Sequence, residues 1–146
     1  MGKTFYNGAM KRIFIAFGLL WIGVWLIFGT FLFIWHGPYL EKSMLLIDQG
    51  NFPQFFDKMA TWENNVAAFF HALGLALVTI TLGTFSTELD FSERLMKILI
   101  PMQIAGVAFS GLCHLTDFIP GMVAGECLVF SVIIVCFVKW MKIITK

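Results

Sequence analysis

Three histidines and one carboxylate are the side chains of this sequence best suited to chemistry, and all four lie in or beside long apolar stretches. His71 and Glu126 lie inside such stretches, whereas His36 and His114 lie at their ends. A neutral imidazole in a dry, apolar cavity is a good ligand for haem iron, and for zinc or copper when other ligands converge with it. Hydrogen bonding of His71 to a backbone group or to Glu126 would produce the same pattern, so a structural role for His71 stays open.

The remaining reactive side chains form no motif of a soluble enzyme. Cys113, Cys127 and Cys136 lack the spacing of a metal site or a disulfide framework, which favours their interpretation as small core residues. The sequence contains no glycine-rich phosphate loop, nucleophile elbow or paired carboxylates. Glu126 is interpreted either as a hydrogen-bond partner of His71 or Gln103, or as a proton carrier.

The elements that must position these side chains are membrane-spanning helices. Of the 146 residues, 59% are hydrophobic and 13% are charged, a composition far too apolar for a soluble protein of this size. Four stretches can each cross about 30 Å of hydrocarbon at about 1.5 Å per residue: residues 13–35, 66–85, 98–115 and 121–138. The sequence therefore predicts one all-α transmembrane domain over residues 1–146, folded as an integral membrane four-helix bundle.

The basic residues predict how this bundle is oriented. Eight of the ten lie before the first span, between the second and third, or after the fourth, and only Lys42 and Lys58 lie elsewhere. Because positive loops stay on the cytoplasmic side, both termini are predicted to be cytoplasmic, in a multi-pass protein of a bacterial inner membrane. The long connection at residues 36–65 then faces outward, and its apolar residues predict an interfacial, partly helical lid over a site.

The predicted orientation puts the ionisable residues in the outer half of the bilayer. Glu126 lies roughly 8 to 9 Å inside the fourth span, and His71 lies one to two turns inside the second. An ionisable group in hydrocarbon costs a few kcal/mol or more, so both side chains are expected to point into the bundle. Two spans offer matching small or polar faces: Asn64, Ala67, His71 and Gly74 on the second, and Gln103, Gly106, Ser110, Cys113, His114 and Asp117 on the third.

A glycine pair predicts one close helix contact. Gly121 and Gly125 have the GxxxG spacing that lets two membrane helices approach closely, within the chain or across an oligomer. Membrane lipid, other membrane helices and a small apolar molecule are the expected partners, whereas a net charge of +1 gives no reason to expect nucleic acid.

Two segments carry a resemblance to a known family. Gly111 to Pro120 resembles a family pattern of Gly, apolar residues, Ser or Thr, Asn or Asp, Phe, any residue and Pro. Phe70 to Leu77 is similar to the haem-ligand segment of the same family. With the order of its spans and loops, the chain resembles, over most of its length, the small membrane haem b proteins of the styrene oxide isomerase family.

The resemblance implies a four-helix protein that binds haem b, as a homo-oligomer and often as a trimer, with His71 as the axial iron ligand. Cofactor contacts are expected from Gly74 and His114, and pocket residues from Ser110, Cys113, His114 and Glu126. In that family, ferric haem acts as a Lewis acid that opens an epoxide, and a hydride shift then gives an aldehyde without net redox chemistry.

Two other functions stay open. If His114 supplies a second axial ligand, the iron is closed to substrate and the protein is a b-type electron-transfer protein. If no cofactor binds, it is an accessory subunit of a membrane complex.

Overall fold

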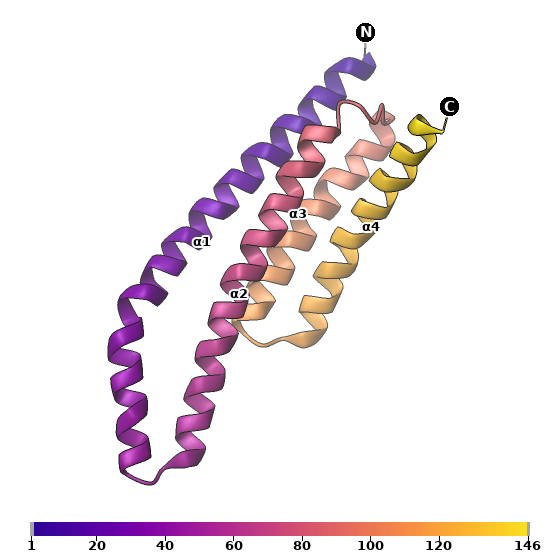
Figure 1. Cartoon of the computed structure of the whole chain (residues 1–146). Helices are drawn as coiled ribbons and strands as arrows, with labels where there is room; N and C mark the ends of the chain where they lie inside the picture. The colour runs from indigo at the N-terminus through magenta and orange to yellow at the C-terminus, as the bar shows by residue number, and fades with distance from the viewer. Residues whose placement is uncertain (1, 146) are drawn as a thin grey trace.

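The computed structural model describes the backbone of residues 2–145 and the side chains of residues 8–145, and it contains four long helices (Figure 1). These helices are α1 (Gly2–Asp48), α2 (Phe52–Phe85), α3 (Glu93–Leu115) and α4 (Ile119–Ile144). The two ends of the chain lie at the same end of the bundle (Figure 1). Each helix is long and apolar enough to cross a membrane, so the predicted all-α, four-span class is confirmed. The side chains of Lys3 and Lys146, which contribute to the predicted orientation, lie outside the described residues.

Local sequence sets most of the helix ends. The Ser92 side chain accepts a hydrogen bond from the Leu95 backbone N–H at 3.4 Å and so caps the start of α3. Pro120 lies in the first turn of α4, where its missing N–H costs nothing. Asp117 has a φ of 51° in the short connection between α3 and α4, a conformation that Asp adopts more readily than most residues.

The segment at residues 36–65, predicted as an interfacial, partly helical lid, is helical in both halves and forms a hairpin. Its first half continues α1 to Asp48 and its second half begins α2 at Phe52, with a tight turn between them at Gly50, whose φ is 70°. The hairpin extends past the end of α3 and α4 and covers neither of them (Figure 1). Contacts between its own arms explain the helical form: Trp62 lies 5.0 Å from the ring of Tyr39, and the Tyr39 hydroxyl donates to the Lys58 carbonyl.

The helices pack in chain order, and α4 is attached mainly through α3. Among the described residues, α1 packs along α2 and touches α3, α2 packs on α3, and α3 packs on α4, whereas the backbone of α4 scarcely approaches that of α1 or α2. At the end that carries the termini, one cluster of buried side chains joins Met10 and Phe14 of α1 to Met96 of α3 and Val132 of α4. Beyond this cluster, the side of α4 that faces α2 is left open.

Glycines bring α3 and α4 into close contact. A Cβ atom at Gly125 would lie 2.6 Å from the Ser110 backbone nitrogen, and one at Gly106 would lie 2.8 Å from the Gly125 carbonyl oxygen. Gly121 packs against Cys113 in the same contact. The predicted GxxxG contact therefore forms within the chain, and it uses a third glycine, Gly106, from the facing helix.

Replacement of Gly125 by Ala is expected to destabilise the bundle. The added methyl group would force α4 away from α3, and overpacking of this kind costs about 1–3 kcal/mol. Gly23→Ala is the matched control, since a Cβ at Gly23 has no atom within 4 Å and Ala favours helix. Thermal unfolding in detergent should show a midpoint lower than wild type for Gly125→Ala only; equal midpoints for the two variants would contradict the close contact.

Candidate functional site

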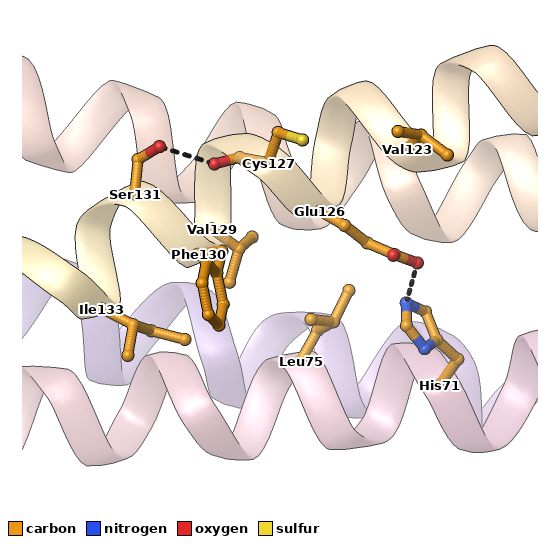
Figure 2. A pocket seen from close by; sticks show the side chains of 9 residues that line it. All are labelled: His71, Leu75, Val123, Glu126, Cys127, Val129, Phe130, Ser131 and Ile133. Atoms are coloured by element: carbon orange, nitrogen blue, oxygen red, sulfur yellow. Dashed lines mark hydrogen bonds and ion pairs between the residues drawn. The ribbon is translucent and has the colours of Figure 1, made fainter.

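The candidate site is centred on the Nε2 atom of His71, which meets side chains from two other helices. Nε2 lies 3.1 Å from the hydroxyl oxygen of Ser110 on α3 and 3.3 Å from a carboxylate oxygen of Glu126 on α4. Figure 2 shows the Glu126 side chain extending from α4 across to the imidazole on α2. The side chains of His71 and Glu126 are 31% and 47% exposed, so the pair lies at the edge of the bundle, not at its centre.

His114 adds a second imidazole, held face to face with the first. The two rings are nearly parallel, with 4.4 Å between their centroids and 5° between their planes. The Nδ1 atom of His114 is buried without a hydrogen-bond partner among the described residues. Asn64 donates a 2.9 Å hydrogen bond to the His114 carbonyl oxygen and so ties this end of α3 to α2.

The three side chains together have the composition of a metal site. Ligand atoms of His71, His114 and Glu126 all lie within 4.8 Å of one another. Tetrahedral zinc with ligand bonds of about 2.0–2.2 Å holds two ligand atoms about 3.3 Å apart, which is the observed separation of His71 Nε2 and the Glu126 carboxylate. His114 fits less well, since two stacked rings cannot both direct a lone pair at one ion. Its ring would have to turn to complete the set.

A groove of about 510 Å³ begins at this pair and runs along the open side between α2 and α4. His71 and Leu75 line it from α2, and the opposite wall is α4, with Phe130 and Ile133 directed into the gap (Figure 2). Apart from His71 and Glu126, the surfaces of the groove are largely apolar. The groove is open along its side, so an apolar or flat molecule can enter it from the membrane without passing through the bundle.

The other residues predicted for the site have different positions. Ser110 reaches His71 but is fully buried, and Cys113 is 7% exposed, so both lie in the α3–α4 packing and not on the groove wall. Gly74 is exposed and a Cβ there would meet nothing within 4 Å. His36 lies in the hairpin, where its ring is tilted by 40° against that of Trp62 with 5.0 Å between the centroids.

A second buried polar pair lies deeper between α2 and α3. The Gln103 side-chain amide donates to the Thr79 hydroxyl at 2.8 Å, and both residues are completely buried. The side-chain oxygen Oε1 of Gln103 has no hydrogen-bond partner among the described residues. Thr79 was not predicted as a polar residue of the interior; it lies on the buried stripe of α2 with Ala72 and Ala76, about 80° round the helix from His71.

Comparison of the chain with protein-family models, with characterised proteins and with solved structures finds no match in any of the three. The resemblance to the styrene oxide isomerase family therefore rests on the two sequence segments and the order of the spans and loops.

Replacement of Glu126 by Leu is expected to raise the thermal stability of the protein. A carboxylate at this depth is costly, and His71 keeps Ser110 as a partner when Glu126 is removed. Ser131→Leu is the matched control for added apolar volume, because Ser131 lines the same groove and bonds only its own helix. Thermal unfolding in detergent should show a higher midpoint for Glu126→Leu than for either wild type or Ser131→Leu. A lower midpoint would mean that the His71–Glu126 pair is needed for folding.

Proposed function

We propose that this protein is a membrane haem b protein in which His71 is the axial ligand of iron, as the resemblance to the styrene oxide isomerase family implies. The groove between α2 and α4 supports the proposal. Its volume of about 510 Å³ is in the usual range for cofactor sites. Its walls are apolar, and an imidazole is present at one end. Glu126, which is half exposed on a flexible side chain, would swing away from Nε2 when iron takes its place.

The observation that carries the proposal is the parallel stacking of His71 and His114. The two rings lie side by side, 4.4 Å apart and nearly parallel, so in this arrangement they would not hold one haem between them. Of the two, only His71 lines the groove. This arrangement favours a single protein ligand, and therefore a haem with one face open to substrate, over the electron-transfer protein with two histidine ligands.

The proposed chemistry is that of the family that the chain resembles. Bound ferric haem would supply a Lewis acid for the isomerisation of a small apolar epoxide to a carbonyl compound. Leu75, Val129 and Phe130 would exclude water from the developing cation, which water would otherwise trap. Glu126 would be the acidic group closest to the substrate, and His114 would hold the His71 ring in place by stacking.

The proposal includes the assembly and its membrane. We place the protein in a bacterial inner membrane with both termini on the cytoplasmic side, because most of the described basic residues lie at the end of the bundle that carries the termini. A homo-oligomer, with a trimer as the expected form, would cover the open side between α2 and α4. The 47% exposure of Glu126 supports such a cover, since carboxylates in membranes are normally shielded by protein.

Replacement of His71 by Ala is expected to abolish haem binding. Protein purified from haem-supplied cells should show a Soret band for wild type and none for His71→Ala. His36→Ala, which removes an imidazole outside the site, should keep it. Wild type should also convert styrene oxide to the aldehyde, measured by gas chromatography. An unchanged Soret band in His71→Ala would refute the ligand assignment.

A non-haem metal ion is the second candidate, favoured by the 3.3 Å separation of His71 Nε2 and the Glu126 carboxylate. Two histidines and one carboxylate are typical ligands of zinc and of non-haem Fe(II). Elemental analysis of the purified protein separates the candidates: about one zinc or iron per chain without a Soret band, lost in Glu126→Gln, would identify the metal ion. Absence of both haem and metal would favour the accessory-subunit function.

A further inference from the structure

A second groove of about 270 Å³ lies at the end of the bundle that carries the termini, far along α4 from the candidate site. It is formed by the start of α3 and one face of α4. Most of its lining is apolar, and the exception is a pair of lysines: the lining residues are Phe91, Leu95, Ile134, Val135, Val138, Lys139 and Lys142. The groove thus combines an apolar wall with positive charge at one end.

The two lysines lie together at the membrane-surface end of this wall. Lys139 and Lys142 are three residues apart on α4, so they are neighbours on the helix surface. Lys139 is partly buried and Lys142 is exposed. Neither forms an ion pair with a described side chain, and Glu93, an acidic residue at the start of α3, is engaged with Lys97 at 2.7 Å. The positive charges of Lys139 and Lys142 are therefore available to a molecule bound in the groove.

The opposite face of α4 provides an internal comparison. A groove of about 320 Å³ there is lined by α2, the following connection and α4, and it contains no charged residue: its lining is Leu82, Phe85, Leu89, Ile133, Cys136, Phe137 and Trp140. Both grooves can accept a hydrocarbon chain. Only the groove with Lys139 and Lys142 has groups that distinguish an anionic head from a neutral one.

Because an apolar wall and two lysines line the same groove, we propose that the groove at Lys139 and Lys142 is a binding site for an anionic phospholipid. One acyl chain lies against Ile134, Val135 and Val138, and the phosphate and glycerol head group is held by the two ammonium groups. Basic pockets beside membrane helices on the cytoplasmic side commonly bind such head groups. The site is independent of the haem proposal, since it shares no residue with the His71 groove.

Native mass spectrometry of the full-length protein in detergent tests the proposal with two probes, phosphatidylglycerol and phosphatidylcholine at equal concentration. We expect wild type to retain phosphatidylglycerol preferentially. The preference should fall about five-fold for each lysine replaced by Gln, and so about 25-fold in the Lys139→Gln/Lys142→Gln variant. Lys42→Gln/Lys58→Gln, which removes the same charge from the other end of the protein, should bind as wild type does.

Four results would overturn the proposal. The first is an unchanged preference in Lys139→Gln/Lys142→Gln. The second is an equal loss in Lys42→Gln/Lys58→Gln, which would show an effect of net charge alone. The third is displacement of the lipid by inorganic phosphate at equal concentration, which would show that the apolar wall contributes nothing. A Lys139→Arg/Lys142→Arg variant, with charge retained, should keep the preference; its loss in this variant would also count against the site.

Discussion

The close contact between α3 and α4 at Gly125 determines where both partners of His71 lie. Gly125 packs on the backbone of Ser110, and the next residue along α4 is Glu126. Successive helical residues are rotated by about 100°, so when Gly125 faces α3, Glu126 must face the gap toward α2. Ser110 itself supplies the other oxygen beside the imidazole. One glycine contact therefore fixes the position of two polar groups on two helices against a third.

The sequence predicted four long apolar helices and most of one of the two polar helix faces correctly. On α3, four residues of the predicted face are buried as expected: Gln103, Gly106, Ser110 and Cys113. Their spacing of about 3.5 residues matches the side of α3 that packs against the neighbouring helices. The small or polar face predicted for α2 is not the buried one, because Ala67 and Gly74 are exposed. The buried stripe of α2 consists instead of residues at spacings of three and four that are small but mostly apolar: Ala68, Ala72, Ala76, Thr79 and Gly83. Small size, which permits close packing in a membrane, was the better signal than polarity.

The hairpin could not be distinguished from an interfacial lid by local pattern. Its charged and apolar residues alternate in a way that suits either a helix lying on the membrane or two arms packed on each other. What decides between them is the pairing of distant residues, such as His36 and Tyr39 with Trp62, and no local window contains both partners. The same limit applies to the stacking of His71 on His114, which joins residues 43 positions apart.

The attachment of α4 through α3 leaves a long seam on its α2 side, and the seam changes character along its length. The part near the α3–α4 connection holds the pair of His71 and Glu126, while the part near the termini has no charged residue in its lining; Ile133 lines both parts. A bundle optimised for stability alone would close this seam with side chains, since a buried interface needs no carboxylate. An open apolar slot that begins at an imidazole and a carboxylate is instead the arrangement that the proposed haem function requires, since it would admit a hydrophobic molecule to the His71 end.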